Sequence, residues 1–117
     1  MLNYCHMSTT LPSLLLTLGF TQKEADVYLA IQKHGRIATV HLAEATGINR
    51  TTVYSVAKEL LAKGVIVEDL GSPTRELLAS SPEELQRLLE RQMSDIKQKQ
   101  SVVDEAVEMV REIAGDA

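Results

Sequence analysis

The chain has 117 residues, a formal net charge of −4, a hydrophobic content of 44% and a charged content of 24%. This composition is typical of a globular protein rather than a disordered one, and the length fits one compact domain with an extended appendage. The longest apolar run, LLLTLGF, is far shorter than the roughly 20 residues needed to span a bilayer. We therefore expect no membrane-spanning segment.

The first nine residues predict a flexible leader, in which Met7 is an alternative start to Met1. This segment has no basic region followed by an apolar core, so it is not a secretory signal. The single cysteine, Cys5, excludes an intrachain disulfide and agrees with a reducing compartment. The expected location is cytoplasmic.

The charge is unevenly distributed along the chain. Residues 1–75 hold seven Lys/Arg against six Asp/Glu, a balance of +1, whereas residues 76–117 hold five against ten, a balance of −5. The excess acid therefore lies in the C-terminal third. The first two thirds can still present a local basic surface to a partner such as nucleic acid.

Two helices are expected before residue 36. A short apolar helix covers Leu11 to Leu18. The TQKE segment (21–24) is a capping box, in which the threonine hydroxyl accepts from the third helical amide and the glutamate reaches back. This box begins a second helix that ends at Gly35. Its inward stripe comprises Ala25, Val27, Tyr28, Ala30 and Ile31.

A pair of helices is expected in the middle of the chain. The RIAT segment indicates a short extended link, with Thr39 as the N-cap of a helix that runs to about Ala45. Gly47 breaks this helix, and Asn49 caps the next, which covers residues 50–63. The small Ala43, the glycine four residues later and an apolar residue inside the second helix match a helix-turn-helix pattern.

A β-hairpin and a long helix are expected after Gly64, which ends the second helix of the pair. Two extended runs, VIVEDL (65–70) and TRELLAS (74–80), flank the turn signal GSP. The SPEE segment (81–84) then provides an N-cap, a proline at the first helical position and acids at the positive end of the helix dipole. The final helix contains no Gly or Pro before about Ala114.

The helix over residues 50–63 has an unusual outward face. At 100° per residue its core stripe contains Val53, Val56, Ala57, Leu60 and Leu61. The opposite face carries hydroxyls and small residues rather than the Glu/Lys pairs of a solvated helix. Such a face suits close approach to the major groove of B-DNA. The expected DNA-facing residues are Arg50, Thr51, Thr52, Tyr54, Ser55 and Lys58, with Arg75 on the wing.

The predicted fold is therefore mainly α with a small β-hairpin. A winged helix-turn-helix domain covers residues 10–80, and a long C-terminal coiled-coil dimerisation helix covers residues 81–117. We expect the recognition helix (about 50–63) to lie in the major groove and the wing (about 70–76) to contact the DNA backbone or minor groove.

Three segments resemble the TrmB family of transcriptional regulators: LTLGFTQKEADVYLAIQKHG, LAEATGINRTTVYSVAKELLAKGVIVE and SPEEL. Together they cover roughly residues 14–90. The resemblance implies a winged helix-turn-helix followed by a coiled-coil helix, and dimeric binding to operator DNA. By position it implicates Arg50, Thr51, Thr52 and Tyr54 in the recognition helix and Arg75 in the wing.

This chain departs from the TrmB pattern in two places. Many members have a basic, tyrosine-containing wing, whereas SPTRELLAS here holds a single arginine, so a weaker wing contact is expected. Long members also continue into a sugar-binding effector domain, whereas this chain ends at Ala117. The sugar-binding function is therefore not carried over to this chain, no small-molecule effector is evident, and whether one exists stays open.

The final helix carries a heptad pattern, with nine positions spaced alternately four and three residues apart. The apolar members, expected to form a dimer seam, are Leu85, Leu89, Ile96, Val103, Ala106, Val110 and Ile113. Gln92 and Lys99 complete the pattern and weaken the seam while fixing its register. At ~1.5 Å per residue the helix is roughly 48 Å long, too long for a small core to cover, so we expect a homodimer. Parallel and antiparallel pairing both remain open, as does a helix that folds back on its own domain.

No enzyme or metal site is expected. His6, His34 and His41 are scattered, and the sequence contains no phosphate loop or nucleophile elbow. No cofactor is therefore expected. Three functions remain: a homodimeric, sequence-specific DNA-binding transcription regulator, which is favoured; a winged-helix protein-interaction module of a transcription complex; and a non-specific chromosomal DNA-binding protein, which the thin basic surface disfavours.

Overall fold

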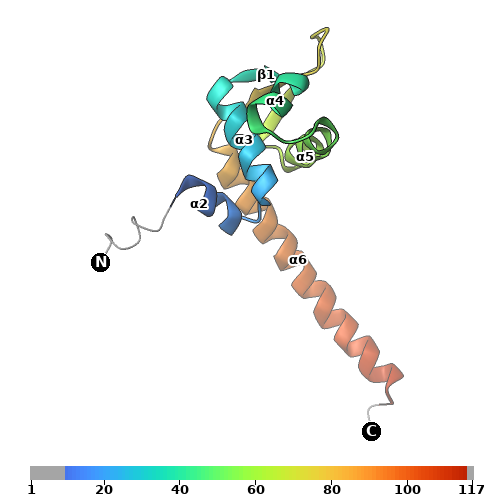
Figure 1. Cartoon of the computed structure of the whole chain (residues 1–117). Coiled ribbons are helices and arrows are strands. Elements are labelled where there is room, and N and C mark those ends of the chain that lie inside the picture. Colours follow the sequence, from blue (N-terminus) through green and yellow to red (C-terminus); the bar gives the residue numbers. More distant parts are fainter. Residues whose placement is uncertain (1–9, 116–117) are drawn as a thin grey trace, which may run out of the picture. The chain divides into compact units, whose positions relative to one another are not determined.

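The computed structural model describes residues 10–115, so the predicted leader lies outside the described residues. The chain divides into two compact units, one up to Leu85 and one from Gln86 onward. The elements, shown in Figure 1, are α2 (Leu11–Thr17), α3 (Gln22–His34), β1 (Arg36–Ala38), α4 (Thr39–Thr46), α5 (Arg50–Lys63), β2 (Ile66–Asp69), β3 (Glu76–Ala79) and α6 (Glu84–Ile113). The architecture is mainly helical with a small antiparallel sheet and a long C-terminal helix, as predicted.

The capping box at the start of α3 is present as the sequence predicts. The Thr21 hydroxyl accepts from the Glu24 backbone N–H at 3.1 Å, and Glu24 Oε1 accepts from the Thr21 N–H at 2.9 Å. The other Glu24 oxygen, Oε2, lies 3.3 Å from Lys63 Nζ at the end of α5. One carboxylate thus stabilises the helix start and joins the two helices.

The turn between α4 and α5 has the predicted geometry. Gly47 adopts a left-handed conformation with a φ of 74°, and the Asn49 side chain accepts from the Thr52 N–H at 2.9 Å. Gly64 ends α5, also in the left-handed region. These conformations are easily reached by glycine, because it has no Cβ.

The prediction that Thr39 caps α4 was wrong. Ala38 occupies the N-cap position without a side-chain hydrogen bond, and Thr39 is the first helical residue. The Thr39 hydroxyl and backbone N–H both donate to the Arg75 carbonyl, each at 3.1 Å. A partner from the hairpin thus satisfies the amide at the helix start, and a local cap is not needed.

The sheet has three strands rather than the two predicted. Its order is β1-β3-β2, and both pairings are antiparallel. Ile37 of β1 pairs with Leu77 of β3, and both side chains are buried. The segment predicted as an extended link is therefore the third strand, and it joins the hairpin to the helix pair.

The long helix α6 begins at Glu84, two residues later than predicted. Ser81 and Pro82 instead belong to a preceding turn, in which the Glu84 N–H donates to the Ser81 carbonyl at 2.9 Å. Within residues 10–115, no helix combines the length and apolar character required to cross a membrane.

The first compact unit has an aliphatic core to which each of its helices and the sheet contribute. Its largest fully buried side chains include Leu15, Ile31, Leu42, Leu60 and Leu77. Such residues each stabilise the fold by about 1.5–3 kcal/mol through burial. This core fixes α5 against α3 and α4 and leaves the outward face of α5 for function.

Candidate nucleic-acid interface

Helix α5 separates buried and exposed residues as the sequence predicts. Val53, Val56, Ala57 and Leu60 are buried, whereas Leu61 is half-buried. The predicted DNA-facing residues Arg50, Thr51, Tyr54, Ser55 and Lys58 are exposed, and Thr52 is half-buried. The helix therefore presents hydroxyls and cations on one continuous face.

Within residues 10–115, two of the three cations of α5 have no ion-pair partner. No described residue pairs with Arg50 or Lys58. Lys63, by contrast, pairs with Glu24 and lies 5.9 Å from the centroid of the Phe20 ring. Arg50 and Lys58 are thus available to an anion, whereas Lys63 supports the fold.

The hairpin loop between β2 and β3, yellow in Figure 1, projects beyond α4. Its first residue, Leu70, is 86% exposed. The Gly71 N–H donates to Asp69 Oδ1 at 3.0 Å and shapes the turn. Because none of residues 70–75 is buried, the loop is held by its ends rather than by the core.

Two arginines engage the acids at the base of the hairpin. Arg75 Nε donates to Glu68 Oε2 at 2.7 Å. Arg36 Nη1 donates to both Asp69 Oδ2 and Glu76 Oε1, each at 2.7 Å. The hydrogen bond from Arg36 lowers the pKa of Asp69, and the Gly71 N–H adds to this effect.

The ion pair between Glu68 and Arg75 was not predicted from the sequence. The sequence identifies Arg75 as the wing's one clear cation, and the structure shows that this charge is paired. The Glu68 side chain is only 18% exposed, whereas that of Arg75 is 70% exposed. The carboxylate is therefore mostly covered, while the guanidinium remains open to solvent.

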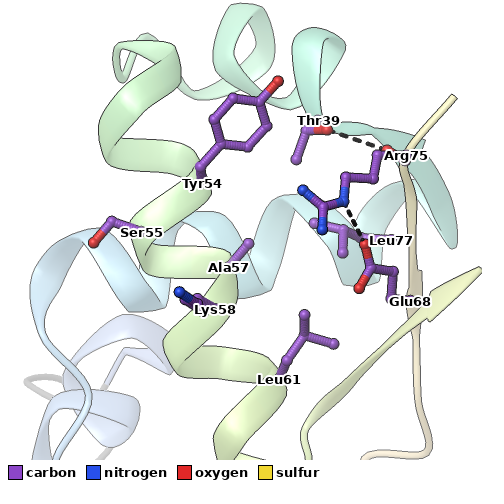
Figure 2. Close-up of a pocket in the computed structure, with 9 residues that line it drawn as sticks. All are labelled: Thr39, Tyr54, Ser55, Ala57, Lys58, Leu61, Glu68, Arg75 and Leu77. Atoms are coloured by element: carbon purple, nitrogen blue, oxygen red, sulfur yellow. Dashed lines mark hydrogen bonds and ion pairs between the residues drawn. The ribbon is translucent and has the colours of Figure 1, made fainter.

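A cleft of about 470 Å³ lies between α5 and the hairpin. Figure 2 shows the Arg75 side chain extending toward α5, with Tyr54 above it, whereas Ser55 points away on the far side of the helix. Four predicted site residues belong to its lining, among them Ser55 despite the direction of its side chain, while Arg50, Thr51 and Thr52 lie outside it. The lining residues are Thr39, Tyr54, Ser55, Ala57, Lys58, Leu61, Glu68, Arg75 and Leu77.

Helix α6 carries the predicted seam as an exposed apolar stripe. Exposure of its large members ranges from 45% at Leu89 to 86% at Ile113, and Ala106 is also exposed. The first predicted member, Leu85, is half-buried. An exposed stripe of this length is typical of a surface that another chain covers.

The sequence model of the family "Sugar-specific transcriptional regulator TrmB" matches residues 14–83, which is more than half of the chain. The chain belongs to the TrmB family. This result confirms the resemblance seen in the sequence, and a family of transcriptional regulators agrees with the expectation that the chain is not an enzyme. A comparison with curated proteins finds no matching sequence.

Solved structures with the same fold include other regulators. TrmBL2, described as an archaeal chromatin protein with a novel mode of DNA binding, is 20% identical with a TM-score of 0.76, over 88% of this chain and 41% of that chain. Transcriptional regulator Tm0710 from Thermotoga maritima is 20% identical with a TM-score of 0.56, over 97% of this chain and 88% of that chain. YusO from Bacillus subtilis is 17% identical with a TM-score of 0.54, over 88% of this chain and 80% of that chain. This TrmB-family chain thus has a winged-helix DNA-binding fold and spans less than half of TrmBL2.

Sequence reasoning missed three residues that shape the interface of this TrmB-family chain. Thr39 and Glu68 both bond to Arg75, through its carbonyl and its guanidinium respectively. Arg36 holds the acids on the neighbouring strands. The only available signal was the close sequence spacing of Glu68 and Arg75 across the predicted hairpin.

The described residues contain no cluster suited to a metal ion. Within residues 10–115, no three His, Cys, Asp or Glu side chains lie close enough together to hold one. Cys5 and His6 lie outside the described residues.

Proposed function

We propose that this chain is a homodimeric, sequence-specific transcriptional regulator that binds double-stranded DNA. In this proposal α5 enters the major groove and the wing, residues 70–76, contacts the backbone or minor groove. The observation that carries the proposal is the exposed face of α5, where hydroxyl side chains lie beside Arg50 and Lys58, two cations that form no ion pair with any described residue. Membership in the TrmB family supports the same function.

The proposed division of labour on α5 follows from side-chain chemistry. Lys58 and Arg50 carry the positive charge that phosphates attract, and Arg50 also has the fork that binds guanine edges. Thr51, Thr52 and Ser55 are short enough to let the helix approach base edges closely. Phosphate contacts would set the orientation of the domain, and the hydroxyls would discriminate among bases.

Two copies of the chain are proposed because one domain offers few cations. On α5 only Arg50 and Lys58 form no ion pair with another described residue, so one domain neutralises few phosphates and binds weakly. The exposed apolar stripe of α6 supplies a surface for a second copy. A two-fold dimer presents two recognition helices to a pseudo-palindromic site.

The experiment that tests this function is a selection of random duplex DNA on the purified protein at near-physiological salt, repeated with Arg50→Ala and Ser55→Ala. We expect a two-fold-symmetric motif, with enrichment lost in both variants. Enrichment without any motif would support non-specific binding instead. No enrichment by a folded, dimeric protein would refute DNA binding and favour a winged-helix protein-interaction module.

A further inference from the structure

We propose that the cleft between α5 and the hairpin seats one sugar-phosphate unit of the DNA backbone, and that Glu68 limits how strongly this site binds it. This inference rests on the DNA-binding function proposed above. It concerns the cleft lined by Tyr54, Ala57 and Leu61 of α5 and by Glu68 and Arg75 of the hairpin.

The chemistry of the cleft matches a sugar-phosphate unit. Ala57, Leu61 and Leu77 give it an apolar floor, which suits the carbon face of a deoxyribose. The Arg75 guanidinium extends over this floor toward α5 (Figure 2) and is 70% exposed. Tyr54, also exposed, adds a hydroxyl donor at the rim. The phosphate can therefore bind the Arg75 guanidinium and the Tyr54 hydroxyl, while the sugar ring packs on the apolar floor.

Arg75 retains donors for a phosphate although it is already paired. Its bond to Glu68 uses Nε, and no described residue accepts from its two Nη groups. Terminal nitrogens of a guanidinium bind phosphate oxygens as a planar fork. Glu68 can therefore keep its bond while Arg75 binds the backbone.

The charge of Glu68 opposes the same contact. Its carboxylate lies 2.7 Å from Arg75 Nε, so the pair is nearly neutral as seen by an approaching phosphate. Since the Glu68 side chain is mostly covered, solvent only partly screens its negative charge from a phosphate bound to Arg75. Repulsion between the two anions then weakens the site. Glu68 is thus a residue that sets the affinity of the wing side of the interface.

The test compares charge changes inside and outside the cleft. Binding of each variant to a labelled duplex carrying the selected motif is measured by fluorescence anisotropy at several salt concentrations. We expect Arg75→Gln to weaken binding and to reduce the slope of log K against log salt by about 0.9 per protomer, the value for one lost phosphate contact. Lys33→Gln, an equal charge change at the exposed end of α3, serves as the control.

Glu68→Gln keeps a hydrogen-bond acceptor for Arg75 and removes only the negative charge. We expect it to bind the duplex about five-fold more tightly, because the phosphate no longer faces an anion. The matched control is Glu59→Gln, an exposed acid of α5 that lies about 160° from Leu61 around the helix, away from the cleft. Its effect should stay below about two-fold.

The outcomes separate this inference from the proposed function. If the wild type binds the duplex but Arg75→Gln has the salt slope of Lys33→Gln, the cleft holds no phosphate and the inference is wrong. It is equally wrong if Glu68→Gln binds no more tightly than Glu59→Gln. If the wild-type protein fails to bind any duplex, the proposed function itself fails.

Discussion

Replacing Glu24 should destabilise the domain far more than a typical surface substitution. Its Oε1 accepts from the Thr21 N–H at 2.9 Å, and its Oε2 lies 3.3 Å from Lys63 Nζ. The side chains of Glu24 and Lys63 are 8% and 21% exposed, so solvent screens their attraction only partly. Glu24→Ala removes both interactions at once.

The expected loss in the free energy of unfolding is the sum of these two contributions. Loss of the capping bond costs about 1 kcal/mol. Loss of the ion pair costs about 1–2 kcal/mol, below the value for a fully buried pair because Lys63 can still reach water. The sum of about 2–3 kcal/mol corresponds to a decrease in Tm of about 10–20 °C for a domain of this size.

The assay is thermal and urea unfolding followed by circular dichroism, at one fixed protein concentration because self-association stabilises the folded state. Glu24→Gln retains an acceptor for Thr21 and should lose only about half of that free energy. The reasoning is refuted if Glu24→Ala costs less than about 0.5 kcal/mol, as at an ordinary surface site. Equal costs for both variants would show that the capping bond contributes nothing.

Three further predictions concern other parts of the chain. Val103→Asp, which puts a charge in the α6 seam, should shift the protein from dimer to monomer in sedimentation equilibrium, whereas Glu108→Gln, on the opposite side of the heptad, should not. Gly47→Ala should cost about 1–2 kcal/mol in urea unfolding, because a φ of 74° is strained for a residue with a Cβ. The added Cβ would itself meet no atom within 4 Å beyond the neighbouring residues, so the cost comes from the backbone alone. An unchanged free energy of unfolding would show that the turn relaxes. Arg36 lowers the folded-state pKa of Asp69, so this pair stabilises the protein above the unfolded pKa of about 4 and loses that effect as pH falls through the folded value. The stability difference between wild type and Arg36→Gln should therefore shrink as pH falls into the acid range, and a difference that stays unchanged there would contradict this origin.

The start of α3, the turn between α4 and α5, and the end of α5 could be predicted because their signals are local. The Thr21 box, the Asn49 cap and the left-handed Gly47 and Gly64 each depend on residues within a few positions. The core stripe of α5 also follows from spacing within one helix. Each of these features depends on residues close together in the sequence rather than on distant contacts.

The third strand and the state of Arg75 could not be predicted in this way. β1 has only three residues, too few to show an alternating pattern. It forms a strand because it pairs with β3, which lies some 40 residues further along the chain. Similarly, the spacing of Glu68 and Arg75 does not reveal whether the two side chains face each other. Both features depend on pairing in space, which a local pattern does not encode.

Strand β3 is the middle strand of the sheet, hydrogen-bonded on both sides, while the loop before it contributes no buried side chain. The base of the hairpin is therefore held in place by the sheet, whereas the residues of its tip make no contribution to the core. Insertions or exchanges among residues 70–74 would leave the core and the position of α5 intact. The tip can thus vary at residues 70–74, none of which is buried, without a matching change elsewhere in the fold.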